Sequence, residues 1–122
     1  MLLDTYAWVE FFKGTGKGEK VKELLRKNAC FSSAISLAEL SEWIEREGIE
    51  RDKVIPVVKK LSSIIEVDQQ TFELAGIIKV KKRETAKGFG LIDAIILATA
   101  RQYNLKLVTG DKHFQGENTL IL

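Results

Sequence analysis

Four acidic residues, far apart in the chain, have the type and the setting to bind a divalent cation. Asp4 ends a short apolar segment at the N-terminus, and Asp111 lies just past the apolar run 105–109. Asp93 lies inside an apolar segment, where a carboxylate is partly desolvated and needs a partner. Glu39 lies near the start of a segment with helical periodicity. These four residues are the candidate catalytic and metal-binding set.

The chemistry of four gathered carboxylates is restricted. They would repel one another at neutral pH unless some stayed protonated or a cation neutralised them. Among their sequence neighbours, the only basic residue is Lys112, beside Asp111. Hard oxygen ligands without a cluster of Cys or His favour Mg²⁺ or Mn²⁺ over zinc. An ion of this kind activates water and stabilises charge on a phosphoryl oxygen, so the set predicts phosphoryl chemistry.

Each acid also has a purely structural interpretation. Glu39 completes a capping box with Ser36 at the start of a predicted helix. Asp4 and Asp111 can cap the elements that follow them. Asp93 can interact favourably with the dipole of its helix. Taken singly, each structural interpretation suffices. Taken together, four acids at matching ends of an α/β sheet favour a functional site.

The predicted elements alternate short apolar strands with longer helices. This pattern predicts an α/β fold with a mostly parallel sheet of four to five strands. In such sheets a site forms beyond the carboxyl ends of the strands, near a topological switch point. Residues 13–18 are predicted as a loop, and Pro56 indicates a late helix start or a kink. Strands are predicted at residues 1–4, 29–34, 63–67, 105–109 and 119–122, and helices at residues 5–12, 19–28, 36–47, 51–62, 70–87 and 91–104.

Length and composition suit one domain over residues 1–122. Of the 122 residues, 45% are hydrophobic and 30% are charged, which is enough to bury one core under a solvated surface. The only cysteine, Cys30, excludes an internal disulfide and zinc sites of the CxxC type. No signal-peptide pattern is present, and no apolar run approaches the length of a membrane span. We therefore expect a cytoplasmic protein.

Four motifs resemble those of the PIN-domain nucleases, and within them the VapC toxins of toxin–antitoxin pairs. The resemblance covers nearly the whole chain, and its last two motifs are the most specific. In the family, an Asp in an apolar helix that ends in Ala-Thr-Ala is followed by a strand and a Thr-x-Asp-x-x-Phe turn. The motifs are Leu2-Leu-Asp-Thr5, Ser36-Leu-Ala-Glu-Leu40, Leu91-Ile-Asp-Ala-Ile-Ile-Leu-Ala-Thr-Ala100 and Leu107-Val-Thr-Gly-Asp-Lys-His-Phe114.

The resemblance implies a fold, an activity and partners. The implied fold is a three-layer α/β/α sandwich, and the implied activity is Mg²⁺- or Mn²⁺-dependent endonucleolytic cleavage of RNA. The implied partners are a second copy in a homodimer and a cognate antitoxin. Gly110 departs from the family, which often has a larger or basic residue there, and this alters the expected substrate contacts. The implied metal-site residues are Asp4, Glu39, Asp93 and Asp111, with Thr5 and Thr109 as supporting hydroxyls.

A cluster of basic residues follows the predicted helix 70–87 towards its end. One interpretation is a solvated face that suits the negative end of the helix dipole. The other is a surface that binds the phosphates of RNA leading to the acidic site. The sequence leaves both open. The cluster comprises Lys79, Lys81, Lys82, Arg83 and Lys87.

Other functions compete with a ribonuclease. A catalytically silent PIN-fold subunit that binds RNA or an antitoxin would not need all four acids. A phosphatase or receiver-like domain usually has paired acids at the first strand, and no second acid follows Asp4 two residues later. A DNA-directed nuclease stays open, because acidic sites do not themselves distinguish the 2′-hydroxyl.

Overall fold

A five-stranded, all-parallel sheet forms the centre of the structure, a computed structural model that describes residues 1–114 and 116–122. Its strand order is β3-β2-β1-β4-β5. Because β1 and β4 are neighbours but far apart in the chain, the strand order reverses between them, and this is the switch point. The strands are β1 (Leu2–Leu3), β2 (Phe31–Ser33), β3 (Ser63–Ile65), β4 (Leu107–Thr109) and β5 (Thr119–Ile121).

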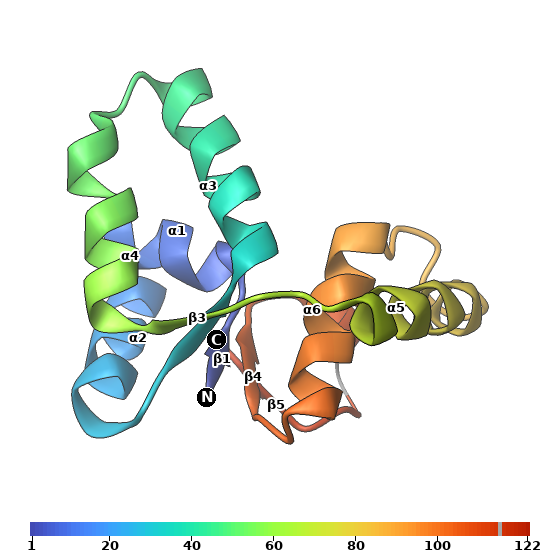
Figure 1. Cartoon of the computed structure of the whole chain (residues 1–122). Coiled ribbons are helices and arrows are strands. Elements are labelled where there is room, and N and C mark those ends of the chain that lie inside the picture. Colours follow the sequence, from blue (N-terminus) through green and yellow to red (C-terminus); the bar gives the residue numbers. More distant parts are fainter. Residues whose placement is uncertain (115) are drawn as a thin grey trace.

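Helices cover both faces of this sheet (Figure 1). Alternate strand residues point to opposite faces. Leu2 and Leu107 accordingly join the core cluster under α5 and α6, whereas Leu3 and Val108 join the cluster under α1 to α4. The prediction of an α/β/α sandwich around a parallel sheet is therefore confirmed. The helices are α1 (Thr5–Lys13), α2 (Gly16–Lys27), α3 (Ala34–Glu47), α4 (Ile55–Leu61), α5 (Gln69–Lys82) and α6 (Leu91–Gln102), with 3₁₀ turns η1 (Arg51–Lys53) and η2 (Lys112–Phe114).

The glycine-rich segment 13–18 was predicted as a loop, and this is wrong at Lys13, which ends α1, and from Gly16 onward, where α2 begins. The Thr15 side chain caps α2 by accepting a hydrogen bond from the Gly18 amide at 3.0 Å. A Cβ at Gly18 would lie 2.1 Å from the Glu10 carbonyl oxygen. The missing side chain thus lets α2 approach the backbone of α1, and tertiary packing overrides the low helix propensity of glycine.

Two other predicted helices are shorter in the structure. Residues 51–62 split into η1 and α4, with Pro56 in the first turn of α4, so the predicted late start is confirmed. The predicted helix 70–87 ends at Lys82. In the described part of the chain, every helix is too short or too polar to cross a membrane.

Candidate functional site

Asp4 stands at the carboxyl end of β1 and begins α1. Its side chain caps the helix by accepting a hydrogen bond from the Ala7 amide at 2.8 Å, so the capping interpretation is correct as far as it goes. The residue is only 6% exposed, and no Lys or Arg of the described residues forms an ion pair with it. Burial raises the pKa of Asp4 to about 7, although hydrogen bonds from Thr109 and Ala7 oppose the shift. A cap alone does not require a buried carboxylate.

Glu39 contacts the start of α1 from the neighbouring helix. The Thr5 hydroxyl donates a hydrogen bond to Glu39 Oε1 at 2.5 Å. Helix α3 is capped by Ser33, which accepts from the Ile35 amide, so the capping box of Ser36 with Glu39 is wrong. Ser36 is instead buried in the first turn, and Glu39 lies further along the helix. Without the capping role, the position of Glu39 is best explained by its contact with Thr5.

Asp93 is held in the first turn of α6. Its Oδ2 accepts a hydrogen bond from the Gly90 amide at 3.3 Å, as expected for an acid at a helix start. Burial raises the pKa of Asp93, and the nearby Asp111 carboxylate raises it further. The pKa of Glu39 is also raised, first by burial and then by the charge of Asp93. Asp93 therefore interacts electrostatically with the other acids, including Asp4.

Asp111 follows β4 and begins η2. Its amide donates to Thr109 Oγ1 at 3.0 Å, and its Oδ1 accepts from the His113 amide at 2.9 Å. Thr109 is fully buried, and its hydroxyl also interacts with Asp4. This side chain thus links the acid after β1 to the acid after β4, across the switch point of the sheet. His113 Nδ1 lies 3.1 Å from Asp111 Oδ1 at the surface.

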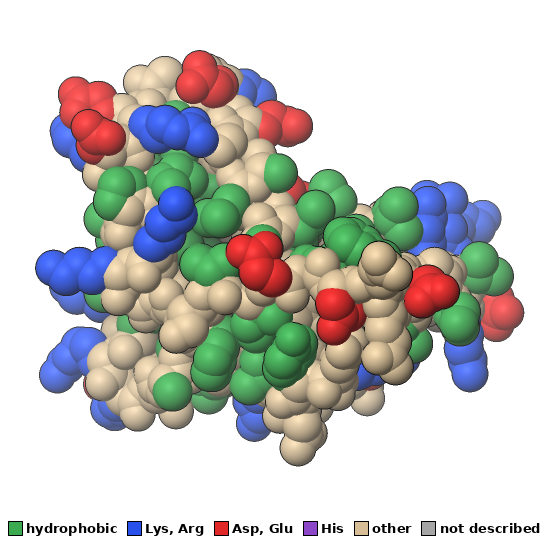
Figure 2. Space-filling view, viewed as in Figure 1, with side chains coloured by type: hydrophobic (Ala, Val, Ile, Leu, Met, Phe, Trp, Pro, Cys, Tyr) green, Lys and Arg blue, Asp and Glu red, His purple; other side chains and the backbone are tan. Residues whose placement is uncertain are grey.

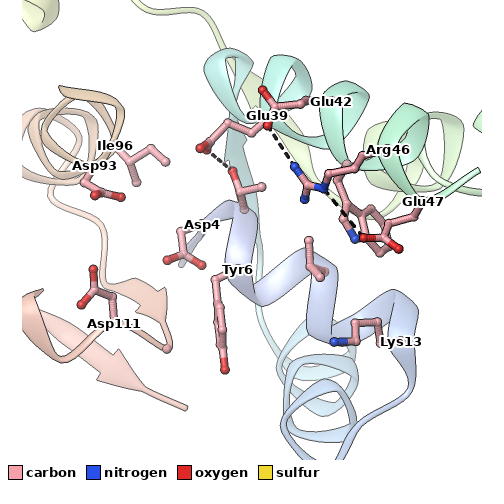
Figure 3. A pocket seen from close by; sticks show the side chains of 14 residues that line it. Asp4, Tyr6, Lys13, Glu39, Glu42, Arg46, Glu47, Asp93, Ile96 and Asp111 are labelled. Atoms are coloured by element: carbon pink, nitrogen blue, oxygen red, sulfur yellow. Dashed lines mark hydrogen bonds and ion pairs between the residues drawn. The ribbon is translucent and has the colours of Figure 1, made fainter. Parts of the chain in front are cut away.

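One cavity of about 670 Å³ is lined by all four predicted acids (Figure 3). Each acid lies in or directly beside a different element, so the fold gathers residues that are up to 107 positions apart in sequence, from Asp4 to Asp111. In the part of the chain that the structure describes, no three Asp, Glu, His or Cys side chains are close enough together to hold one metal ion. The four carboxylates share a cavity but not a closed coordination sphere.

The donor set nevertheless fits a hydrated divalent ion. Mg²⁺ binds through one or two carboxylates and keeps several waters, so it does not require a closed cage of protein ligands. The buried Asp4 carboxylate lacks a cationic partner among the described residues, which is the observation that calls for a cation. All four groups are oxygen donors, which suits Mg²⁺ or Mn²⁺ and does not suit zinc.

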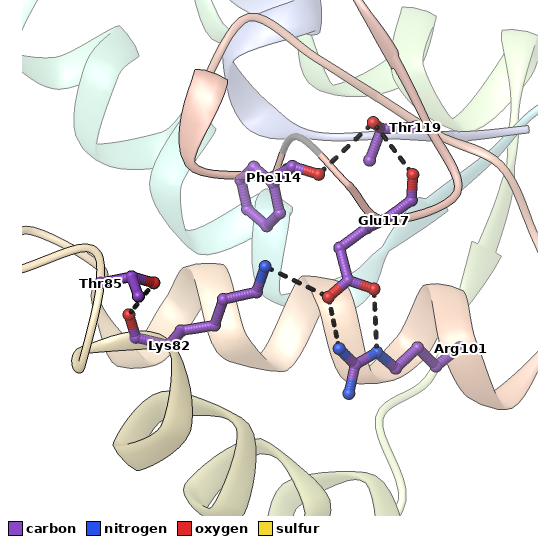
Figure 4. Close-up of polar contacts among 6 residues, drawn as sticks. All are labelled: Lys82, Thr85, Arg101, Phe114, Glu117 and Thr119. Carbon is purple, nitrogen blue, oxygen red and sulfur yellow. Dashed lines mark hydrogen bonds and ion pairs between the residues drawn. The ribbon is translucent and has the colours of Figure 1, made fainter.

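The basic cluster lies elsewhere. None of Lys79, Lys81, Lys82, Arg83 and Lys87 lines the acidic cavity. Figure 2 shows Lys and Arg side chains gathered over the end of α5. Lys82 Nζ forms an ion pair with Glu117 Oε1 at 3.2 Å (Figure 4). Arg83 Nε donates to the Phe89 carbonyl at 3.0 Å. Two of the five residues are therefore engaged in contacts that stabilise the fold.

Several residues that line the cavity were not predicted as site residues, among them Tyr6, Lys13 and Arg46. Arg46 lies seven residues after Glu39, and Lys13 lies seven after Tyr6, a spacing that keeps side chains on one helix face. This periodicity could have identified them. Arg46 Nη1 pairs with Glu42 Oε1 at 3.1 Å, an exposed pair of the kind that contributes little stability.

A sequence model described as the PIN domain matches residues 1–116. This chain belongs to the PIN-domain family. The predicted resemblance is thereby confirmed at the level of the family, and the fold agrees with it. Comparison with curated protein sequences gave no significant match.

Solved structures of similar fold span almost the whole PIN-domain chain. A toxin–antitoxin complex from Klebsiella pneumoniae is 24% identical with a TM-score of 0.78, covering 98% of this chain and 94% of its own. VapBC2 from Rickettsia felis, bound to a DNA fragment from its promoter, is 19% identical with a TM-score of 0.74, covering 99% and 96%. VapC20 from Mycobacterium tuberculosis, a toxin that cleaves the sarcin–ricin loop, is 20% identical with a TM-score of 0.69, covering 96% and 91%.

Proposed function

We propose that this PIN-domain protein is a metal-dependent endoribonuclease and the toxin of a toxin–antitoxin pair. One observation carries the proposal. Four carboxylates from four elements line one cavity at the switch point of the sheet, and the most buried of them has no cationic partner among the described residues. Burying such a charge costs stability, which is expected at a functional site and is not expected of four helix caps.

Asp4, Asp93 and Asp111 would hold a Mg²⁺ or Mn²⁺ ion, with Glu39 beside them. When bound, the ion supplies an activated water and neutralises charge on a phosphoryl oxygen. Thr109 restrains both Asp4 and Asp111, because its buried hydroxyl interacts with both residues. Thr5 holds the Glu39 carboxylate at the rim of the same cavity.

Family relationships support the finer parts of the proposal. A toxin of similar fold from Mycobacterium tuberculosis is described as cleaving the sarcin–ricin loop, which supports RNA as the substrate. Other chains of similar fold are found in complexes with antitoxins, which supports an antitoxin partner. We expect the protein to act in the cytoplasm, where RNA is its substrate.

The proposed homodimer has a candidate surface on α5. Phe72, Ile77 and Val80 of this helix are 47%, 68% and 72% exposed. Three large apolar side chains on one helix favour burial against another protein surface, and we propose a second copy as the partner. Ile77→Asp with Val80→Asp should convert a dimer into a monomer in analytical ultracentrifugation. A wild-type protein that sediments as a monomer would contradict this assignment.

The experiment that tests the activity measures cleavage of labelled RNA by the purified protein with Mg²⁺ or Mn²⁺. We expect cleavage that stops with EDTA and falls by more than about a hundredfold in Asp93→Asn, since even indirect supports of metal sites are worth that much. Asp52→Asn is the matched control, because Asp52 is an exposed acid on η1 outside the cavity.

Two outcomes would replace the proposal. A wild-type protein that binds RNA or an antitoxin but cleaves no RNA with either metal would be a silent binding subunit. Equal or faster cleavage of DNA of matched sequence would make it a DNA-directed nuclease.

A further inference from the structure

Tyr6 is the accessible aromatic side chain of the acidic cavity. Two aromatic residues line this cavity in the described structure. Trp43 is 9% exposed and packs near Phe12, with ring centroids 6.4 Å apart, so it belongs to the core. Tyr6 is 38% exposed and lies in the first turn of the helix that Asp4 caps. Its ring is therefore held next to the acids by a rigid helix start but stays open to solvent.

Gly110 provides the space for this ring. A Cβ at Gly110 would lie 2.0 Å from Cε1 of Tyr6 and 2.4 Å from Cδ1, so any side chain would displace the tyrosine. The backbone φ of Gly110 is not in the left-handed region, which leaves close packing as the reason for glycine there. This is the position at which the sequence departs from the PIN-domain pattern. The glycine at position 110 and the placement of the Tyr6 ring therefore depend on each other.

Lys17 steadies the ring without covering its face. Its Nζ donates to the Tyr6 hydroxyl at 3.0 Å and lies 5.4 Å from the ring centroid. Those two distances place the ammonium beyond the hydroxyl, near the ring edge. Lys13, on the same helix, lines the cavity as well. Figure 3 shows Tyr6 between Asp111 and Lys13 in this view.

We propose that Tyr6 is a stacking platform for an unpaired base next to the scissile phosphate. The proposal rests on the ribonuclease function and specifies how the substrate is positioned. Proteins recognise single-stranded RNA by stacking its bases on aromatic side chains. A strand whose phosphate lies at the acids can place its neighbouring base on Tyr6 and its next phosphate near Lys13. Tyr6 is thus a specificity residue for unpaired rather than double-helical substrate.

Binding to a short fluorescent single-stranded oligoadenylate tests the proposal. Binding is measured in the Asp93→Asn background with Mg²⁺ present, so that the RNA is not cleaved during the measurement. Tyr6→Leu should weaken binding about tenfold, as expected for one lost stacking contact. Tyr6→Phe keeps the ring and should restore the affinity. Tyr103→Leu is the matched control, because Tyr103 is 47% exposed at the opposite end of α6 from Asp93.

A second measurement separates stacking from a structural role. A single 2-aminopurine is placed in turn at each position of the oligomer, and its fluorescence should be quenched at one position by the protein with Tyr6 but not by Tyr6→Leu. Removing the base at that position should cost affinity with Tyr6 and cost nothing further with Tyr6→Leu. Gly110→Ala should reproduce the loss, because its Cβ displaces the ring. A uniform loss at all positions would overturn the proposal, as would unchanged binding.

Failure of the ribonuclease proposal would look different. If the wild-type protein fails to cleave RNA but base-specific quenching depends on Tyr6, the site binds nucleic acid without cleaving it and the stacking role stands. If the wild-type protein cleaves RNA and Tyr6→Leu has no position-specific effect, the stacking role is overturned and the ribonuclease stands.

Discussion

The acidic cavity and the Glu117 cluster (Lys82, Arg101 and Glu117) hold acids with opposite pKa shifts, the buried Asp4 and the half-buried Glu117. Glu117 accepts from Arg101 Nη2 at 2.5 Å and from Nε at 3.3 Å, and it pairs with Lys82 at 3.2 Å (Figure 4). Burial alone would raise the pKa of Glu117, but the two cations outweigh it and the pKa is lowered. In the cavity, Asp4 is buried among other acids, and its pKa is raised to about 7.

The difference distinguishes structural charges from functional ones. An acid with two cationic partners is neutralised within the folded protein, so removing it leaves the cations unpaired and costs stability. A buried acid without such a partner costs stability when it is ionised, and such acids are common at functional sites. The Glu117 cluster therefore joins α5, α6 and the segment before β5, whereas the acidic cavity is open to a ligand.

Asp4→Asn is the largest expected effect on this comparison. Asparagine keeps an oxygen that accepts from the Ala7 amide but removes the buried charge. Cleavage of RNA should fall by more than about a hundredfold. At pH 8 and without metal, the free energy of unfolding of Asp4→Asn should be about 2 kcal/mol higher than that of the wild type, because the substitution removes an uncompensated buried carboxylate. Urea unfolding in EDTA measures the gain, and adding Mg²⁺ should stabilise only the wild-type protein. A lower stability of Asp4→Asn would contradict the statement that the buried Asp4 carboxylate costs stability.

Glu117→Gln should act in the opposite direction. It leaves Lys82 and Arg101 without their partner and should destabilise the fold by about 1–2 kcal/mol. RNA cleavage at low temperature should be unchanged, because Glu117 lies outside the cavity. Glu23→Gln is the control: Glu23 pairs with exposed Arg26 and Lys27, and its loss should cost less than about 0.5 kcal/mol.

The pH dependence of this effect has a definite sign. The pKa of Glu117 is lower in the folded protein than its model value of 4.5. The stability that Glu117 contributes is therefore fully present above pH 4.5 and is lost as the pH falls through the lower, folded pKa. The difference in unfolding free energy between wild type and Glu117→Gln should shrink only below that pH. A difference that shrinks already near neutral pH would show that the cations are not what lowers the pKa.

The smallest expected effect is the difference in RNA affinity between Lys13→Gln and Lys81→Gln. Lys13 lines the acidic cavity, whereas Lys81 lines a separate one near Glu117. Lys13→Gln should weaken RNA binding several-fold and reduce the salt dependence of binding by about one phosphate contact. Lys81→Gln should have the smaller effect. If a salt titration of RNA affinity shows the larger effect for Lys81→Gln, the phosphate-binding surface lies on α5 instead of at the acidic cavity.

Sequence patterns identified the elements well where periodicity and caps were local. The strand positions, the apolar α6 and the late start at Pro56 were predicted, because alternating apolar segments and proline act within a few residues. The glycine-rich start of α2 was missed, because Gly18 is explained only by the Glu10 carbonyl that packs against it. The basic residues near Lys82 were open to two interpretations, because Glu117 lies thirty-five positions away in sequence and contacts Lys82 only in the fold.

By itself, the sequence determined which residues could do chemistry and that they would lie at the carboxyl edge of a parallel sheet. The alternation of strands and helices predicted a parallel sheet, and acids that follow parallel strands meet at one edge of it. Only the tertiary structure decided that Glu39 contacts Thr5 instead of capping its own helix, that Asp4 is buried without a cation among the described residues, and that Gly110 makes room for Tyr6. Burial and contact depend on residues distant in sequence, so local patterns do not encode them.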